Sequence, residues 1–390
     1  MRVPVGILRV DSPEIASYVW CQEWPTMRIP ELEASGIRYA WDSVTALDRY
    51  YGVPRSSFRY LAVEASLSEI APHLPEMSFE GYLDSDAVAR YDGVQLLIRC
   101  TDSLKQRPRR SFQIQHFLYR PSRDCYIDTD DCYPVIRSGE LGEERTVPVT
   151  GYERLQEWLD LAVLLSRYPI RKPKKLPEPL ELKLGEDLST LRPAFSLILT
   201  GPTPWRGLEL LRKGGVIDSL LPEMARMDET DHSKEGHPEG NVWTHTLETL
   251  KYRKTYEEIL SLALLFHDIG KPFSFAEGER RFNQHADIGA EVAREILHRF
   301  GYPGEMVDAV DWLVRYHMIP GALHKLPMHR SRPLMQSELF PFLLELHRCD
   351  ISSTFRGPDS YYRACRVYRS FLRNERNPFR DAEGKKLVRL

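Results

Sequence analysis

Histidine and aspartate side chains recur through the C-terminal half of the sequence, each in or beside an apolar segment with helical spacing. Imidazole nitrogens and carboxylate oxygens are the ligands that borderline divalent metals accept, and several from separate helices can enclose one or two ions. A single histidine on an apolar helix is more often an ordinary core residue, so the prediction of a metal site rests on the whole set. The set comprises His245 in NVWTHTL, His267 and Asp268 in LLFHDIGKP, His285 in FNQHADIGA, His317 in VRYHMIP and Asp350 in LHRCDISS.

The adjacent pair His267 and Asp268 is the centre of the expected site. Neighbours on a helix point about 100° apart, so the pair can approach one metal, or two metals, at an angle. The following Gly270, Lys271 and Pro272 predict a helix end, which would place the pair at a mouth open to substrate. Lys271 could then neutralise a phosphate oxygen, although a solvated lysine at a helix end is an equally good interpretation.

The set of metal ligands predicts an enzyme that hydrolyses phosphoesters. A divalent ion makes hydroxide available near neutral pH and draws negative charge away from a phosphoryl oxygen. Asp268 is the candidate for orienting the nucleophilic water, and Lys271 is the second candidate catalytic residue. The mixed ligand set is compatible with one or two ions of Mn, Fe, Ni, Mg or Zn.

The same segments, together with GLELLRKGGVIDSLLPEM upstream, resemble the HD superfamily of metal-dependent phosphohydrolases. The likeness is greatest to the HD domain of bacterial tRNA nucleotidyltransferases and poly(A)-polymerase-like proteins, and it covers about half the chain. The resemblance implies four core metal ligands, namely His245, His267, Asp268 and Asp350. It also implies that His285 and His317 are ligands of a second metal or contacts to phosphate.

That resemblance extends, on fewer residues, to a polymerase-β-type head in the N-terminal half. GIRYAWDSVTALDRYYGVPRSSFRYLAVEASLSEI resembles the first part of such a head, and RRSFQIQHFLYRPSRDCYIDTDD resembles the last part. The family's glycine pair is replaced by Trp41-Asp42, its D-x-D carboxylates by Phe58 and Tyr60, and an aspartate by Ser111. Neither Phe58 nor Tyr60 can ligate magnesium, so we expect a degenerate, inactive head.

Other carboxylates in the head offer a weaker alternative. Asp84 and Asp86, or Asp128 and Asp130, could supply metal ligands, but polar loop residues near turns are the simpler interpretation. If the family fold is retained, Phe58 and Tyr60 should lie on one strand beside a strand that contains residues 113–115. Short apolar runs predict strands at Val94 to Cys100 and at Ser111 to Tyr119.

The overall pattern predicts an α+β protein with an all-α C-terminal half. We expect a degenerate nucleotidyltransferase-like head at residues 1–150 and a helical neck with a Pro/Lys-rich linker at residues 151–225. An HD domain at residues 226–372 and a basic tail at residues 373–390 complete the chain. The six cysteines form no C-x-x-C pair, and no apolar run is long enough for a membrane span, so we expect a cytoplasmic protein without a membrane partner.

The formal net charge of -3 gives no global attraction to nucleic acid, so any RNA surface must be local. Two basic clusters are candidates, one at Arg109 and Arg110 and one at Lys172, Lys174 and Lys175, although such clusters are often merely solvated.

The sequence thus predicts a metal-dependent phosphohydrolase with an inactive head. Its substrate would be a nucleotide, a cyclic phosphodiester or a phosphorylated RNA end. The alternatives are a non-catalytic RNA-binding protein, possible because of the basic clusters, and a divergent tRNA nucleotidyltransferase, which Phe58 and Tyr60 disfavour.

Overall fold

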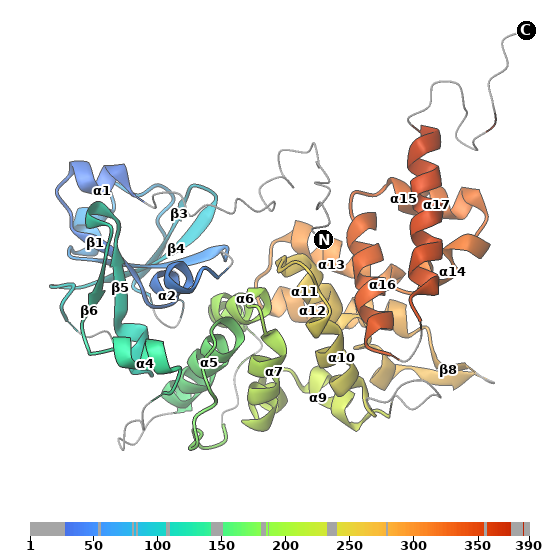
Figure 1. The fold of residues 1–390 in the computed structure, drawn as a ribbon, viewed down its shortest axis with the longest axis horizontal. Helices are drawn as coiled ribbons and strands as arrows, with labels where there is room; N and C mark the ends of the chain where they lie inside the picture. The colour runs from blue at the N-terminus through green and yellow to red at the C-terminus, as the bar shows by residue number, and fades with distance from the viewer. Residues whose placement is uncertain are drawn as a thin grey trace, which may run out of the picture.

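The computed structural model describes residues 28–53, 56–79, 82, 85–106, 110–141, 151–180, 185, 187–231, 240–277, 280–354, 357–375 and 385. A β-sheet with its helices forms the N-terminal part, and a long run of helices forms the rest (Figure 1). The predicted α+β class is therefore confirmed, and the C-terminal half expected to be all-α is mostly helical, with one short hairpin among its described residues. No helix among these residues is long and apolar enough to cross a membrane.

A six-stranded mixed sheet is the centre of the N-terminal part, with strand order β3-β4-β2-β1-β5-β6. β2 runs parallel to β4 and antiparallel to β1. The strands are β1 (Tyr39–Asp42), β2 (Phe58–Val63), β3 (Ala87–Tyr91), β4 (Val94–Cys100), β5 (Phe117–Arg120) and β6 (Cys125–Asp128). The helices beside them are α1 (Pro30–Ala34), α2 (Ser43–Tyr51), α3 (Leu67–Ile70) and α4 (Tyr133–Ser138).

The central strands are the apolar ones. β2 is buried at every position except Arg59, as expected for a strand covered on both faces. β4 begins and ends where its apolar run does, so the predicted strand at Val94 to Cys100 is confirmed. α2 ends at Gly52, whose φ of 63° is a left-handed conformation that glycine adopts without strain.

The predicted strand at Ser111 to Tyr119 is wrong in its first half. Residues Gln113–His116 form a short 3-10 helix, η2, and only Phe117–Arg120 forms strand β5. Consecutive burial of Ile114, Gln115 and His116 does not fit the alternation of a strand. Hydrogen bonds within this segment replace those that a β-strand would make with a neighbouring strand. The Phe112 amide, for example, donates to the Gln115 side-chain oxygen at 3.1 Å. Phe58 and Tyr60 do share one strand, but its neighbours are β1 and β4.

Helices and one short hairpin make up the remainder of the described chain. Helices α5 to α9 lead from the sheet into the C-terminal part, which contains α10 to α17 (Figure 1). Their bounds are α5 (Gly151–Arg167), α6 (Arg192–Thr200), α7 (Pro204–Lys213), α8 (Val216–Leu220), α9 (Pro222–Glu229), α10 (Val242–Lys251), α11 (Glu258–Phe266), α12 (His285–Arg299), α13 (Gly304–Tyr316), α14 (Ile319–Ala322), α15 (Met328–Gln336), α16 (Phe340–Ser352) and α17 (Asp359–Glu375), with 3-10 turns η3 (Pro121–Arg123), η4 (Ser189–Leu191), η5 (Lys271–Phe273) and η6 (Leu323–Lys325) and hairpin strands β7 (Phe275–Glu277) and β8 (Arg280–Asn283).

A buried ion pair fixes the sheet on the first of these helices. Arg167 at the end of α5 donates to both carboxylate oxygens of Asp48 on α2, at 2.8 and 2.7 Å. The Tyr168 hydroxyl donates to the same carboxylate at 2.8 Å. Because both charges are removed from water, losing either partner would leave an uncompensated buried charge.

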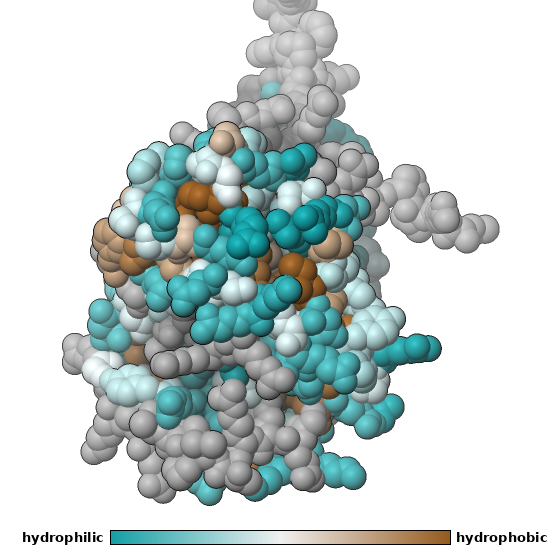
Figure 2. All heavy atoms as spheres, turned by 90° about the vertical axis from the view of Figure 1, so that its left-hand side faces the viewer, coloured by the Kyte–Doolittle hydropathy of each residue, from teal (hydrophilic) through white to brown (hydrophobic). Residues whose placement is uncertain are grey.

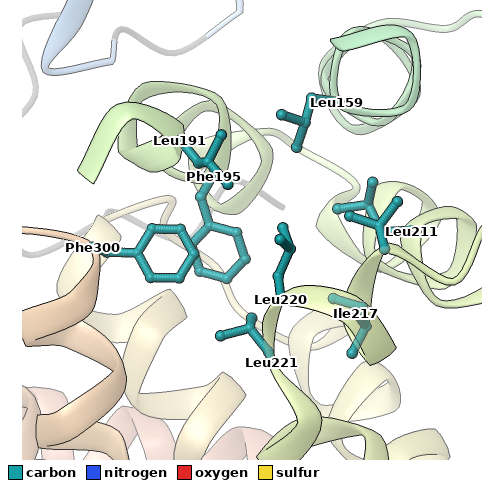
Figure 3. Close-up of a pocket in the computed structure, with 9 residues that line it drawn as sticks. Leu159, Leu191, Phe195, Leu211, Ile217, Leu220, Leu221 and Phe300 are labelled. Carbon is teal, nitrogen blue, oxygen red and sulfur yellow. The ribbon is translucent and has the colours of Figure 1, made fainter. Parts of the chain in front are cut away.

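Helices α5 to α8 pack through an apolar core that contains a cavity of about 10 Å³ (Figure 3). A space of this size holds at most about one water, and its walls offer no polar partner, so it is a packing gap and not a ligand site. Its walls are Leu159, Leu191, Phe195, Leu211, Val216, Ile217, Leu220, Leu221 and Phe300.

The outer surface of the sheet region is mostly hydrophilic, with hydrophobic residues only in small separate patches (Figure 2).

Candidate metal centre

His245 lies on α10, whose start is fixed by a side-chain cap. The Asn241 side-chain oxygen accepts a hydrogen bond from the Thr244 amide at 2.8 Å, which satisfies one of the free amides of the first turn. His245 follows one residue later on the inward face and is fully buried. The position of this imidazole is therefore set by the local sequence of the helix start.

Helix α11 ends at Phe266, so His267 and Asp268 lie in the turn directly after it, a few residues before the helix end predicted at Gly270. Their exposures are only 1% and 3%, so the expected mouth open to substrate at this pair is wrong. The reason is tertiary, because helices α10, α12, α13 and α16 surround the turn. The more accessible residues of the site are Asp350 and His285, whose side chains are 22% and 15% exposed.

His285 and His317 stand at helix ends that face this turn. His285 is the first residue of α12, and His317 directly follows α13. Asp350 comes from the third turn of α16. The structure thus brings together all six residues that the sequence predicts as ligands, from five separate helices.

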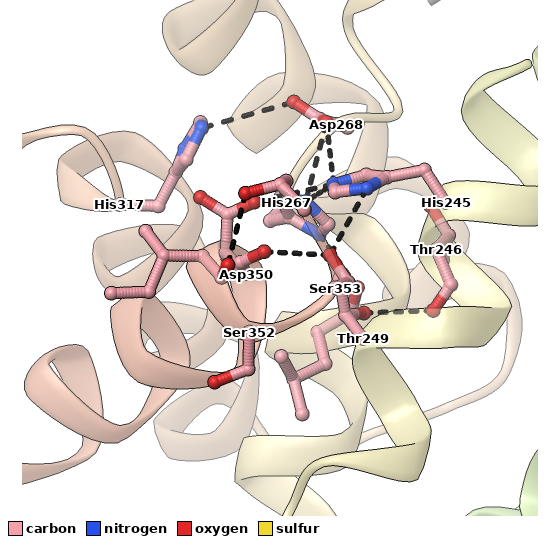
Figure 4. A network of polar contacts seen from close by, with 12 residues as sticks. His245, Thr246, Thr249, His267, Asp268, His317, Asp350, Ser352 and Ser353 are labelled. Atoms are coloured by element: carbon pink, nitrogen blue, oxygen red, sulfur yellow. Dashed lines mark hydrogen bonds and ion pairs between the residues drawn. The ribbon is translucent and has the colours of Figure 1, made fainter. Parts of the chain in front are cut away.

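The six side chains form two groups of three, each with ligand atoms within 4.8 Å of one another. In the first group, the Nε2 atom of His245 lies 3.3 Å from Nε2 of His267 and 3.2 Å from a carboxylate oxygen of Asp350. In the second group, His285 Nε2 lies 3.2 Å from His317 Nε2, and Asp268 is the third member. Figure 4 shows the first group with Asp268 and His317 around it.

Asp268 faces both groups with different oxygens. Its Oδ2 atom lies 3.2 Å from His267 Nε2 and 3.6 Å from His245 Nε2. Its Oδ1 atom lies 3.6 Å from His285 Nε2 and 3.9 Å from His317 Nε2. A carboxylate placed in this way can bridge two cations, one in each group.

The opposite ring nitrogens show that the imidazoles are oriented for metal. Nδ1 of His267, His285 and His317 lies 2.7 to 2.9 Å from the backbone carbonyls of Leu264, Phe282 and Val314. A carbonyl only accepts, so each Nδ1 carries the proton and each neutral ring leaves its Nε2 lone pair facing inward. Such lone pairs repel one another at 3.2 to 3.3 Å unless a cation or a proton lies between them. The donor set therefore fits divalent metal.

The local environment also keeps His317, His285 and Asp350 in the protonation state that metal requires. Burial lowers the pKa of His317 to about 3 and lowers the pKa of His285, in both cases against the charge of Asp268. For Asp350, burial acts to raise the pKa, but the hydrogen bond from His245 and the neighbouring His267 side chain outweigh it and lower the pKa. Neutral imidazoles and an ionised carboxylate are the ligating forms near pH 7.

Two further residues complete the site. The Lys271 ammonium lies 2.5 Å from Asp268 Oδ2, so it pairs with the carboxylate that faces both groups and is not a solvated lysine. The Ser353 hydroxyl lies 3.2 Å from His245 Nδ1 and donates to the Asp350 carbonyl at 2.6 Å. The sequence reasoning missed Ser353, although its place three residues after Asp350 on one helix face was a usable signal.

The residues at the expected nucleotidyltransferase motif lie on β1 and β2 and are buried. The Arg192 guanidinium lies 5.3 Å from the centre of the Phe58 ring, and the Arg110 guanidinium lies 4.9 Å from the centre of the Tyr60 ring. Asp42 is fully buried, accepts from Arg99 at 2.9 Å and lies 3.7 Å from Arg110. Asp42 is therefore committed to ion pairs.

The other head carboxylates among the described residues are also engaged. Asp128 accepts from the amides of Cys132 and Tyr133, Asp130 pairs with His116 at 2.7 Å, and Asp86 accepts from the Cys100 amide. These bonds cap turns and strand ends, as the simpler interpretation of these residues expected. Asp84 lies outside the described residues.

The predicted RNA-binding residues divide into three cases. Arg110 is 5% exposed and faces Asp42 and Tyr60, so its prediction as a surface contact to RNA is wrong, because ion pairing has drawn it inward. Lys172, Lys174 and Lys175 are exposed, and their role stays a prediction. Arg109 lies outside the described residues.

Comparison with known proteins supports the C-terminal assignment. The HD domain family matches residues 242–338. The A-adding tRNA nucleotidyltransferase of Deinococcus radiodurans is 32% identical over 201 residues, which cover 48% of this chain and 43% of that protein. The CC-adding tRNA nucleotidyltransferase of Thermus thermophilus is 33% identical over 206 residues, with the same coverage of 48% and 43%. The Multifunctional CCA protein of Halorhodospira halophila is 35% identical over 122 residues, or 31% of this chain and 29% of that protein. The chain thus spans less than half the length of these relatives.

The fold is shared more widely than the sequence. The crystal structure of the Bacillus stearothermophilus CCA-adding enzyme in complex with CTP matches with a TM-score of 0.51 and 15% identity. The match covers 90% of this chain and 84% of that chain, so it includes the sheet as well as the helices.

These findings correct the predicted function. The relatives and the structural match are nucleotidyltransferases, so the prediction of a phosphohydrolase with a catalytically inactive head is wrong, and a divergent tRNA nucleotidyltransferase fits better. The prediction that the protein is a hydrolase, and specifically a phosphohydrolase, is therefore also wrong. Residues 242–338 thus match the HD domain family, and the chain is similar in sequence to tRNA nucleotidyltransferases and shares the fold of a CCA-adding enzyme.

Proposed function

We propose that this chain is a divergent tRNA nucleotidyltransferase, an enzyme that adds nucleotides to tRNA. The observation that carries the proposal is the shared fold over 90% of the chain, sheet included, with a CCA-adding enzyme. The A-adding and CC-adding relatives, similar over 48% of the chain, support the same class of reaction.

The clearest departure of this chain from the expected nucleotidyltransferase motifs lies on β2. Phe58 and Tyr60 stand at the expected carboxylate positions, and both pack under arginine side chains. A nucleotidyl transfer catalysed here must therefore take its metal-binding carboxylates from other residues. Exposed Lys172, Lys174 and Lys175 would contact the tRNA backbone in the linker that follows α5.

The test is incorporation of labelled CMP and AMP. The full chain is incubated with magnesium and with tRNA transcripts that end before the CCA sequence, after the first C and after the second C. Label in the tRNA product supports the proposal, and the transcript that accepts it defines the nucleotide added. The Deinococcus radiodurans relative on the same transcripts is the positive control. No label from this chain on any of the three transcripts, while the control incorporates AMP after the second C, refutes the proposal.

A second candidate is a tRNA-binding protein without transfer activity, and the burial of Phe58 and Tyr60 favours it. The same experiment separates the two, provided that tRNA binding is measured alongside. Binding without incorporation identifies this second function.

For the HD domain we propose two divalent ions, one in each group of three side chains, with Asp268 bridging them. Mn, Fe, Ni, Mg and Zn remain the candidate metals. A bound ion would offset the charge of a phosphate oxygen at this site. Asp268, predicted as catalytic, would hold both ions, and Lys271 would balance its charge when metal is absent.

Elemental analysis after loading with each metal tests this proposal. Wild type should hold two ions per chain, and His317→Ala and His267→Ala should each lose one, because each removes a ligand of one group only. Asp268→Ala should lower the occupancy of both. His298→Ala, an exposed histidine on α12, is the matched control and should keep two. Equal metal content in all of these variants would refute the two-ion site.

A further inference from the structure

The outer face of α17 carries an unusual stripe of arginines. The exposed residues Tyr362, Arg363, Arg366, Arg369 and Arg373 recur at helical spacing and are called the arginine face here. At 3.6 residues per turn, all five side chains fall within about 120° of the helix circumference. They therefore form one continuous strip along the helix.

Among the described residues, no acidic neighbour pairs with the arginines of this face. α17 has two acidic residues, Asp359 and Glu375, one at each end of the helix, and Glu375 accepts a hydrogen bond from Gln336. Within the part of the chain that the structure describes, none of the four arginines forms an ion pair. Four unpaired guanidinium groups on one face repel one another, a cost that an anionic partner would remove.

The opposite face of α17 anchors the helix firmly. Ala364 and Phe371 are buried, and the Tyr368 ring lies 4.8 Å from the ring of Phe340 on α16. At its N-terminal end, the Ser360 hydroxyl is 3.1 Å from Nε2 of His347, also on α16. The arginine face thus belongs to a fixed helix, so its charges keep a defined spacing.

We propose that the arginine face binds the phosphate backbone of an RNA, which under the proposed function is tRNA. Successive arginines advance about 4.5 to 6 Å along the helix axis, so each can reach a different phosphate. The planar guanidinium group pairs with phosphate oxygens through two hydrogen bonds. Tyr362, 58% exposed at one end of the strip, offers a ring on which a base can stack.

The position of the helix suggests the size of the RNA. α17 lies at the end of the molecule opposite the β-sheet, with the other helices between them (Figure 1). An RNA that contacts both the sheet and the arginine face must span these helices. A folded RNA of tRNA size meets this requirement better than a short oligonucleotide.

The test measures binding of a tRNA transcript to the full chain at a series of salt concentrations. Replacing Arg366 and Arg369 together by Gln should weaken binding about tenfold near 0.1 M salt and reduce the slope of log K against log salt by about 2. The double Lys variant, R366K with R369K, is the matched control and should keep the slope, because it keeps both charges. Thermal unfolding should be unchanged in both variants, since these side chains are exposed.

Unchanged affinity and salt slope in the Gln variant would overturn the arginine face as an RNA site, as would a failure of wild type to bind the transcript. Neither result depends on nucleotide addition. The two proposals can fail separately. If wild type incorporates no label, but the salt slope of tRNA binding is smaller in the Gln variant than in wild type, the arginine face is supported and the proposed transferase is refuted.

Discussion

The backbone of Gly270 lies against the backbone of Gly289, so that a Cβ atom at Gly270 would come within 2.5 Å of the Gly289 nitrogen and 2.0 Å of the His285 carbonyl oxygen. Gly270 ends the turn that carries Asp268, and Gly289 is in the first turns of α12, which begins at His285. This close approach brings His285 within reach of Asp268.

Gly270→Ala should therefore damage the second group of ligands. The added methyl group meets backbone on both sides, so we expect a loss of about 1–3 kcal/mol in unfolding free energy, as for overpacked cores. Metal content should fall toward one ion per chain as α12 moves away. Gly304→Ala is the control, because a Cβ there meets nothing within 4 Å. Thermal unfolding and elemental analysis measure both effects, and an unchanged metal content would contradict the role given to this contact.

Ser353→Ala should weaken metal binding without removing a ligand. The Ser353 hydroxyl is the partner of His245 Nδ1, and loss of such an orienting partner costs roughly 10–100-fold in metal affinity. Ser352→Ala removes a neighbouring hydroxyl that bonds only to the Arg348 carbonyl among the contacts described, so its affinity should match wild type. Metal titration of the two variants decides the point; equal affinities would mean that the hydroxyl does not orient His245.

The metal-free protein should lose stability in acid partly through His317. Its pKa is about 3 in the folded chain and near the ordinary 6.5 when unfolded, so the unfolded state binds the proton first. The destabilisation begins as pH falls through about 6.5 and grows by up to about 1.4 kcal/mol per pH unit toward pH 3. Above pH 7 the group is neutral in both states and contributes no pH dependence.

His317→Gln tests this linkage because glutamine does not titrate. Denaturant unfolding of the metal-free proteins at pH 7.5, 6 and 5 should show a smaller decline for the variant than for wild type. If the free energy of unfolding falls equally with pH in both proteins, the pH dependence comes from a group other than His317.

Substitutions at Arg110 and at the linker lysines should affect different properties. Changing Arg110 should lower stability, and changing the lysines should weaken RNA binding. Arg110→Gln removes one of the two arginines that pair with the buried Asp42, so the free energy of unfolding should fall, by less than the about 3–5 kcal/mol expected when a buried charge is left without a partner. Replacing Lys172, Lys174 and Lys175 by Gln should leave unfolding unchanged and weaken tRNA binding with a reduced salt slope. Unfolding curves and binding isotherms on both variants check this. Full RNA affinity in the lysine variant would remove the linker from the binding surface.

The sequence by itself determined the local features of this protein. Apolar periodicity placed strand β4 at Val94 to Cys100, and the Gly-Lys-Pro sequence placed a helix end close to His267 and Asp268. These features depend on neighbouring residues in the chain, so a single sequence contains them. The six candidate ligands could likewise be named from residue type, spacing and family resemblance.

Only the tertiary structure decided how those residues meet. The two oxygens of Asp268 face different histidine groups because helices distant in sequence converge on it, and the same packing buries it instead of leaving it at an open mouth. Arg110 looked like a surface charge, but Asp42, 68 positions earlier, drew it into an ion pair. Residues Gln113–His116 look like strand in isolation, yet the burial of three consecutive side chains required a 3-10 turn. In each case the deciding contact joins residues far apart in the chain, or depends on burial that only the assembled fold creates.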